Sequence, residues 1–374
     1  MNKWKTVYLE DVCDILDNQR VPVTSKDRKK GVYPYYGANG IQDYVDDYIF
    51  DNELVLLAED GGNFGSKDKP IAYRVSGKCW VNNHAHVLKA RESIDVDYLC
   101  YSLMFYDVSS LVNGATRQKL NQAVMKKMTI PLPILEKQLE IVTRLNKVTH
   151  TIDLCNQLIE KLDLLVKAKF VEMFGEIGAD KFGWGLDKMG DISEINPKKA
   201  KDNRLNSDLE VSFIPMTAVS EKGEIDVSEI RKYDEVKTGF TYFAENDILF
   251  AKITPCMENG KGCIAHNLYN GIGFGSTEFH VLRPLERINP YWLYTVTIFE
   301  QFRKNAFANM TGSAGQRRVP ARFLENFKIS IPPIELQNQF ADFVKQTEKS
   351  KSAVKQVLEK AETLKKALMQ EYFG

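Results

Sequence analysis

The sequence predicts an α+β protein made of two repeated parts, each a globular head followed by one long helix. The main observation is a repeat, because residues 138–175 recur without a gap at 337–374. A proline-containing stretch opens each copy, IPLPILEKQ in the first and ISIPPIELQ in the second. Weaker matches continue upstream of both copies, for example DNELVLLA at Asp51 with ENDILFAK at Glu245. The duplication therefore includes the heads as well as the helices.

Both copies of the repeated segment are predicted to be long helices. In the first copy apolar residues recur at alternating intervals of four and three, which is typical of a coiled-coil seam. At about 1.5 Å per residue, roughly 37 residues would form a rod about 55 Å long. The second seam is weaker because Lys351 and Lys365 fall on it. We expect the two helices to pair within one chain, with approximate two-fold symmetry. The predicted seam residues are Ile141, Leu145, Val148, Ile152, Ile159, Leu162, Phe340, Val344, Val354 and Leu358.

Domain boundaries follow from the prolines and glycines around the helices. Proline presets the entry to a helix and is poorly tolerated inside one. We therefore place the first head at 1–132 and its helix at 133–175. The second head is placed at 176–331, with a glycine-containing linker at its start (176–185), and its helix at 332–374.

Inside the heads, short apolar runs alternate with clusters of Gly, Asn and Asp, which favours a strongly looped and mainly antiparallel sheet. The predicted strands are Leu54–Ala58, Ile71–Val75, His86–Lys89, Asp247–Lys252 and His280–Arg283, and the predicted helical stretches are Asp97–Tyr106 and Pro290–Asn305. The glycine run Gly271–Gly275 is followed by neither a helix nor a well-placed acidic residue, as a dinucleotide site requires. We interpret this run as a loop.

Composition excludes several classes of protein. Fifty basic residues balance fifty acidic ones, which excludes a uniformly basic nucleic-acid binder but not local basic loops. No apolar run approaches the roughly 18 residues of a membrane span. The six cysteines are scattered along the chain, which indicates a reduced, cytoplasmic protein.

No catalytic constellation is evident. The sequence suggests no Ser/His/Asp or Cys/His set, and we expect no catalytic residue, cofactor or metal in this chain. Cys256, Cys263 and His266 are spaced too loosely for a zinc site and lack a fourth ligand. His86 and His280 fall at equivalent places of the repeat, and we interpret both as hydrogen-bonded core histidines.

The loops are better equipped for recognition than for chemistry. Asn and Gln can pair with adenine and Arg or Lys with guanine, while Lys and Ser/Thr suit phosphates. Polar residues also fill ordinary surface loops, so both interpretations stay open for each residue. Gln118 and Gln316 are the best candidates, because they fall beside basic residues at equivalent places. The candidate DNA-binding residues are Asn39, Asn63, Asn83, Arg117, Gln118, Lys119, Lys252, Thr254, Asn259, Lys261, Thr277, Gln316, Arg317 and Arg318.

The layout resembles the specificity subunit of Type I restriction–modification systems. The resemblance rests on two tandem heads, each followed by a long helix that opens with 130–138 or 329–337 and ends in phenylalanine–glycine. The runs 4–12 and 247–255 also look like that family's recognition domains. Ser330 departs from the pattern by replacing the first proline of the second copy. The resemblance covers essentially the whole chain but does not identify individual base contacts.

The resemblance implies a non-catalytic reader of double-stranded DNA. Each head would be a target recognition domain for one half of a bipartite sequence, and the helices would form an antiparallel coiled coil that spaces the halves. Methyltransferase subunits, two in number, would dock there and use S-adenosylmethionine. Motor-endonuclease subunits would use ATP and Mg. A Type IIB-like specificity subunit and a two-headed protein-interaction scaffold without DNA remain as alternatives.

Overall fold

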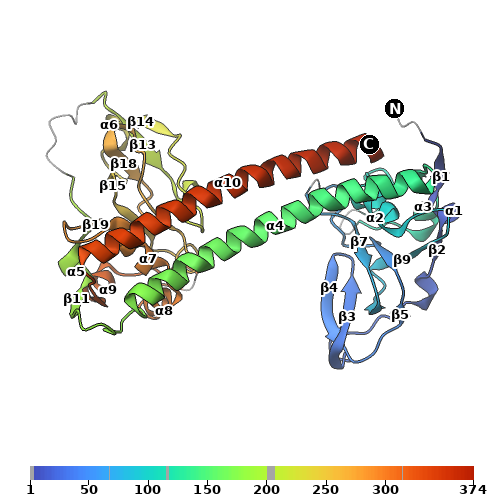
Figure 1. Ribbon diagram of the computed structural model, residues 1–374, viewed down its shortest axis with the longest axis horizontal. Coiled ribbons are helices and arrows are strands. Elements are labelled where there is room, and N and C mark those ends of the chain that lie inside the picture. Colours follow the sequence, from blue (N-terminus) through green and yellow to red (C-terminus); the bar gives the residue numbers. More distant parts are fainter. Residues whose placement is uncertain (1–3, 67, 115–117, 200–206, 314) are drawn as a thin grey trace. The chain divides into compact units, whose positions relative to one another are not determined.

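A computed structural model describes residues 4–66, 68–114, 118–199, 207–313 and 315–374. The chain separates into two compact units, Met1–Asn156 with Gln356–Gly374, and Gln157–Lys355. Each unit contains one head together with parts of both long helices, α4 (Leu135–Phe174) and α10 (Ile334–Phe373) (Figure 1).

The first head is built on two four-stranded sheets. An antiparallel sheet has the strand order β2-β9-β6-β7, and a mixed sheet has the order β4-β3-β8-β5, in which β3 and β8 run parallel. A short antiparallel pair, β1 with β10, closes the head. The bounds are β1 (Thr6–Tyr8), β2 (Cys13–Ile15), β3 (Lys30–Gly37), β4 (Gly40–Val45), β5 (Phe50–Asp51), β6 (Leu54–Ala58), β7 (Ala72–Val75), β8 (Lys78–Val81), β9 (Ala85–Ala90), β10 (Thr129–Pro131), α1 (Leu9–Val12), η1 (Asp17–Gln19), α2 (Val96–Met104) and α3 (Gln122–Lys126).

The second head repeats this architecture. Its antiparallel sheet has the order β12-β19-β16-β17, and its mixed sheet the order β14-β13-β18-β15, with β13 and β18 parallel. The pair β11 with β20 corresponds to β1 with β10. The bounds are β11 (Leu186–Lys188), β12 (Ser193–Ile195), β13 (Glu210–Ile214), β14 (Ile230–Lys232), β15 (Thr241–Ala244), β16 (Ile248–Ala251), β17 (Gly262–Ile264), β18 (Ile272–Gly275), β19 (Phe279–Pro284), β20 (Lys328–Ser330), α5 (Met189–Ile192), η2 (Met216–Ala218), α6 (Tyr233–Val236), η3 (Tyr269–Gly271), α7 (Pro290–Ile298), α8 (Glu300–Ala308) and α9 (Ala321–Asn326).

Local sequence explains the main elements. The central strands β6 and β16 are apolar along their whole length and are buried at every position, as expected for strands covered on both faces. The helix α2 begins after Asp95, whose carboxylate accepts from the backbone N–H groups of Asp97 and Tyr98. The helix α7 begins after Asn289 with Pro290 in its first turn. These are standard helix starts.

Two sequence predictions about the second head were wrong. The run Gly271–Gly275, which we interpreted as a loop, contains the buried strand β18. A Cβ at Gly273 would lie 2.0 Å from the Phe243 ring, so the glycine serves close packing rather than a cofactor. The predicted helix Pro290–Asn305 is two helices, because Phe299 between them is extended, with φ −65° and ψ 139°.

Contacts within each unit give the direction of the long helices. In the first unit the start of α4 meets the end of α10, where Arg144 donates to the Tyr372 hydroxyl at 3.3 Å. In the second unit the end of α4 meets the start of α10, where the rings of Phe170 and Phe340 lie 5.5 Å apart. The two helices are therefore antiparallel.

Repeated glutamines join each helix to its head. Gln138 is fully buried, accepts from the backbone N–H of Asp95 at 2.8 Å and donates to the carbonyls of Ser93 and Pro133. Gln337 does the same in the second unit, accepting from the N–H of Asn289 at 2.9 Å and donating to the carbonyls of Arg287 and Pro332. This explains why a glutamine recurs at the two helix starts.

The predicted seam residues lie on the inner face of the helices. Ile141, Leu145, Ile159, Phe340 and Val344 are buried, and Val148, Ile152, Leu162, Val354 and Leu358 are half-buried. Lys351, on the weak part of the seam, is also buried, and its ammonium lies 2.7 Å from Asp163 and 3.1 Å from Glu348. Over the ranges that the structure describes, none of the helices is long and apolar enough to cross a membrane.

Candidate nucleic-acid interface

Three segments of the first head meet at one margin of its antiparallel sheet. They are the loop after β6, the turn before β9 and the segment before α3. Backbone hydrogen bonds join them, from Glu59 N–H to the His84 carbonyl at 2.9 Å and from Leu120 N–H to the Glu59 carbonyl at 2.7 Å. We call this margin, residues 59–63, 82–84 and 118–122, the first loop edge.

The second head builds the same margin from the equivalent segments. The N–H of Lys252 donates to the Glu278 carbonyl at 2.9 Å, and the N–H of Val319 donates to the Lys252 carbonyl at 2.9 Å. We call residues 252–261, 276–278 and 315–319 the second loop edge. Both edges consist of turns and irregular segments on a rigid sheet, where binding residues commonly lie.

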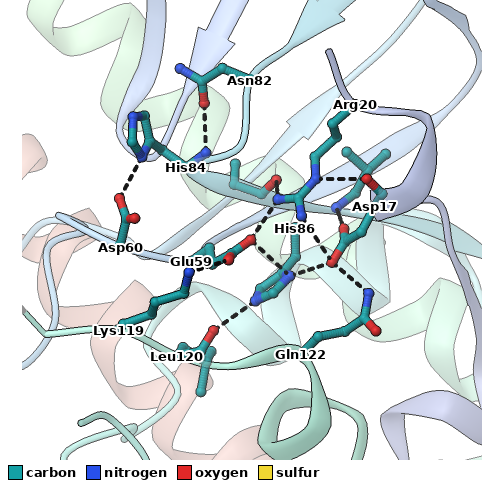
Figure 2. A network of polar contacts seen from close by, with 12 residues as sticks. Asp17, Arg20, Glu59, Asp60, Asn82, His84, His86, Lys119, Leu120 and Gln122 are labelled. Carbon is teal, nitrogen blue, oxygen red and sulfur yellow. Dashed lines mark hydrogen bonds and ion pairs between the residues drawn. The ribbon is translucent and has the colours of Figure 1, made fainter. Parts of the chain in front are cut away.

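A dense polar network stands behind the first loop edge (Figure 2). His86 on β9 is fully buried, with Nδ1 2.6 Å from the Asp17 carboxylate and Nε2 2.8 Å from the Leu120 carbonyl. Arg20 forms an ion pair with Glu59 at 2.6 Å and donates to the Ala85 carbonyl at 2.7 Å. The network ties residues 17–20 to the segment before α3.

The carboxylates of this network are held in the charged form. Burial opposes the charge of Asp17, but hydrogen bonds from His86, the Val87 N–H and Gln122 outweigh it, so its pKa lies below the ordinary range. Burial likewise opposes the charge of Glu59, yet hydrogen bonds from Arg20 and Lys119 lower its pKa. Buried charges of this kind persist only when they are paired and hydrogen-bonded.

The candidate residues of the first head lie on or beside the first loop edge. Asn39 is exposed on the β3–β4 turn and donates to the Gly61 carbonyl at 3.0 Å, which brings that turn to the edge. Asn63 donates to the Pro70 carbonyl at 3.3 Å. Asn83 and Gln118 are exposed. Lys119 is exposed too, although its ammonium lies 2.9 Å from Glu59. Arg117 falls outside the described residues.

In the second head the side chains of the basic candidate residues Arg318 and Lys252 are paired or half-buried. Arg318 donates from Nε and Nη2 to the Glu278 carboxylate, at 2.9 and 2.8 Å. These two hydrogen bonds raise the pKa of Arg318 and lower that of Glu278. Lys252 is half-buried, and burial together with the nearby Arg318 lowers its pKa.

The remaining candidates of the second head also gather at its loop edge. Thr254 donates to the Gly315 carbonyl at 3.1 Å and accepts from the Arg317 N–H at 3.2 Å. Lys261 donates to the Met216 carbonyl at 3.2 Å, and Asn259 donates to Glu221 at 2.7 Å. Thr277 and Gln316 are exposed. The loops that carry these candidates therefore converge.

The structure corrects two pairings between the heads. Lys119 bridges to Asn113, and Arg318 bridges to Thr311 in the same way. Gln118 therefore corresponds to Arg317, and our pairing of Gln118 with Gln316 was wrong by one residue. In the sheets, Leu57 lies opposite His86 and Phe250 lies opposite His280. Glu59 is accordingly the structural equivalent of Lys252, a pairing one residue away from the sequence match.

Several residues of the network were missed from the sequence. Asp17, Arg20, Glu59, Asn196 and Glu278 belong to no motif, and only the three-dimensional fold brings them to the histidines. A signal was available for another group, the basic run 26–30, whose lysines are exposed just before β3 and at its first residue. A cluster of exposed basic residues is what contacts with phosphates require.

Metal binding is not favoured at either place where ligand types gather. Among the described residues, one group, Asp17, Glu59 and His86, offers three ligand atoms within 4.8 Å of one another. The guanidinium of Arg20 and the ammonium of Lys119 already neutralise its carboxylates. In the second head burial raises the pKa of Cys263 to about 12, which disfavours the thiolate that binds a metal. The ring of His266 stacks on Tyr291.

Comparison with known proteins identifies the family. A family model described as "Type I restriction modification DNA specificity domain" matches the chain twice, at residues 1–164 and 182–363. The chain belongs to this family. The two matches cover both heads and most of both long helices.

Individual relatives agree with this assignment. The chain is 30% identical over 354 residues to a protein of Haemophilus influenzae named as a type I restriction enzyme specificity subunit, with 91% of this chain and 86% of the relative covered. It is 45% identical over 159 residues to the specificity subunit of the type I restriction enzyme EcoAI of Escherichia coli, a match that covers 42% of this chain and 26% of the relative. The match thus spans about a quarter of that relative's length.

A solved structure shares the fold. The S subunit of a Type I restriction–modification system from M. genitalium superposes with a TM-score of 0.60, at 13% identity, covering 100% of this chain and 96% of that one. At this identity the likeness concerns the fold alone. The predicted architecture of two repeated α+β heads and long helices is confirmed.

Proposed function

We propose that this protein is the DNA-binding specificity subunit of a Type I restriction–modification complex, with each head reading one half of a bipartite target. The observation that carries the proposal is that the first and second loop edges have the same backbone arrangement but different side chains. Where the first edge has Glu59 and Lys119, the second has Lys252 and Arg318. Two loop edges with one backbone arrangement and different side chains are suited to two half-sites of different sequence.

The chemistry of the edges fits duplex DNA. Exposed amides such as Asn83 and Gln118 can pair with the edges of bases in the major groove. The exposed lysines of 26–30 can contact phosphates, which position a protein without reading sequence. The zero net charge is compatible with this role, because the basic groups are local and a partner subunit can supply more.

The outer faces of the long helices are the proposed docking sites for methyltransferase subunits. Leu158 and Leu165 on α4 are 44% and 48% exposed, and at the equivalent positions of α10 Val357 and Leu364 are each 49% exposed. Each helix thus carries an apolar pair seven residues apart, which is two turns along one face. Two equivalent patches suit two copies of one partner, hence two methyltransferase subunits for each chain.

Catalysis is assigned to the partners. The methyltransferase subunits would hold S-adenosylmethionine, and motor-endonuclease subunits would use ATP and Mg, while this chain would hold no cofactor or metal. The six cysteines are free thiols, which suits the cytoplasm, where chromosomal DNA is methylated.

Methylation-aware sequencing tests the proposal. The chain is co-expressed with the methyltransferase subunit of its own system in a host without restriction systems. We expect methylated adenines in one bipartite sequence with a fixed gap between its halves. Expression of either subunit alone should give no such methylation. Methylation without a bipartite sequence, or none in the presence of both subunits, would refute the proposal.

A further inference from the structure

The two equivalent histidines hold the recognition segments in place. In the first head Nε2 of His86 lies 2.8 Å from the Leu120 carbonyl, and in the second Nε2 of His280 lies 2.7 Å from the Val319 carbonyl. Both rings are at most 5% exposed. Because a carbonyl oxygen can only accept, each Nε2 carries a proton and donates it. One buried bond therefore fixes the same point of each loop edge.

The other ring nitrogen faces different partners in the two heads. In the first head Nδ1 of His86 lies 2.6 Å from the carboxylate of Asp17. That carboxylate also accepts from the Val87 N–H at 2.9 Å and from Gln122 at 2.9 Å. With donors around it Asp17 is ionised and can only accept, so Nδ1 of His86 carries a proton as well. A ring that donates from both nitrogens is an imidazolium.

In the second head the partner is an amide. Asn196 accepts from the Val281 N–H through Oδ1 at 3.1 Å, and Nδ1 of His280 lies 3.0 Å from the amide Nδ2 and 3.2 Å from the amide Oδ1. From the shorter of the two contacts we infer that the amide donates to Nδ1, so that nitrogen carries no proton and the ring is neutral. Burial and the neighbouring Lys252 also lower the pKa of His280. Asp17 and Asn196 are not at equivalent positions of the repeat. The N–H of Leu16 donates to the Val87 carbonyl just as the N–H of Asn196 donates to the Val281 carbonyl, so Leu16 is the equivalent of Asn196.

Neighbouring charges agree with the two ring states. Asp17 and Glu59 face His86, with Glu59 at 3.6 Å from Nδ1, and Arg20 and Lys119 are bonded to these carboxylates. Around His280 the charged groups are Lys252 and Glu278, and Arg318 is forked onto Glu278. A carboxylate thus lies directly against Nδ1 of the first ring, whereas Nδ1 of the second ring faces an amide and has both a cation and an anion in its surroundings.

We propose that His86 and His280 are positioning residues that hold the DNA-reading segments 118–122 and 315–319 through the carbonyls of Leu120 and Val319, His86 as a buried cation and His280 as a neutral ring. The inference rests on the proposed function, because it takes these segments to face DNA. Each histidine then controls affinity for its own half-site only, and in the first head alone a charged ring holds the reading segment.

Binding by the complex of this chain with its methyltransferase subunit tests the positioning role. The duplexes carry both half-sites, or one half-site with the other scrambled. His86→Phe should weaken binding to the full target about tenfold, because it removes a hydrogen bond to a charged donor. With the first half-site scrambled, that penalty should vanish. His280→Phe should behave the same way toward the second half-site, and the exposed His150→Phe is the matched control.

Ring protonation tests the charge states directly, by nitrogen NMR of histidine-labelled full-length protein at neutral pH. We expect two ring protons on His86 and one on His280. Asp17→Asn should remove one proton from His86 while binding stays within about threefold, because the asparagine amide can donate to Nδ1 while its oxygen still accepts from the Val87 N–H. Asn196→Asp should add a proton to His280. These variants also serve if a phenylalanine variant fails to fold.

A penalty for His86→Phe that persists when the first half-site is scrambled would overturn the positioning role. A singly protonated His86 in the natural protein would overturn the charge assignment. If the complex bound duplexes without any half-site preference, the proposed function would fail and the positioning role with it, while the ring states would still be decided.

Discussion

The two heads hold equivalent backbone carbonyls, those of Leu120 and Val319, with different surrounding side chains. In the first, Arg20 and Lys119 neutralise Glu59, and Asp17 faces a charged histidine. In the second, the position of Glu59 is taken by Lys252, and Asn196 faces a neutral histidine. The sheet order and the three converging segments are unchanged. The fold thus determines which backbone groups must be held, and several residue combinations can hold them.

The largest expected effect tests whether each head has its own core. Phe250 is fully buried on β16, and its structural equivalent on β6 is Leu57, also fully buried. Phe250→Ala should lower the free energy of unfolding by about 3–5 kcal/mol and Leu57→Ala by about 2–5 kcal/mol. Urea unfolding followed by tryptophan fluorescence reports on the first head when Trp184 and Trp292 are replaced by phenylalanine, and on the second head when Trp4 and Trp80 are replaced. Equal shifts of both signals by either variant would contradict independent cores.

A smaller effect is expected at the repeated glutamines that join head to helix. Gln138→Leu would leave the Asp95 N–H and two carbonyls without their buried partner, at a cost of about 2–3 kcal/mol. Gln337→Leu should cost a similar amount in the second unit. Gln157→Leu, at an exposed position of the same helix, is the control and should have little effect. Thermal unfolding measures all three, and a harmless Gln138→Leu would mean that the glutamine is not an anchor.

Acid should weaken the second head before the first. The pKa of His280 is lowered, so its unfolded state binds a proton first, and the stability it contributes is full above about pH 6.5 and is lost as pH falls. The pKa values of Asp17 and Glu59 are also lowered, but their contribution is lost only below about pH 4. Hydrogen exchange at pH 5 and at pH 7 should show the second loop edge alone becoming less protected. Earlier loosening of the first edge would reverse the comparison.

The smallest effect is expected in the helix seam. Lys351 is buried beside Asp163, whereas the equivalent position of α4 is the apolar Ile152. Lys351→Leu should change stability by about 1 kcal/mol or less, since replacing a buried ion pair by an apolar side chain is often neutral. Asp163→Leu should cost more, because it removes one of two carboxylates from a buried ammonium. A large loss from Lys351→Leu would show that the ion pair determines helix register.

The sequence was sufficient for the architecture because its signals are local or repetitive. Prolines, heptad spacing and the 138–175 repeat give the helices, and five-residue apolar runs give strands such as β6. The buried network was not predictable, because Asp17, Glu59 and Gln122 are far apart in sequence and meet only through sheet pairing. The strand β18 was missed because its glycines are selected by packing against Phe243, a contact without a local signal.

The most direct test of whether the heads read DNA independently is a methylome comparison of two sets of substitutions in the co-expressed system. One changes Asn39, Asn83 and Gln118 to alanine in the first head, and the other changes Asn259, Thr277 and Gln316 to alanine in the second. We predict that the first set alters the bases of one half-site only, that the second set alters the other, and that the gap between the halves stays the same. Changes in both half-sites from either set, or a changed gap, would contradict two independent readers on a fixed spacer.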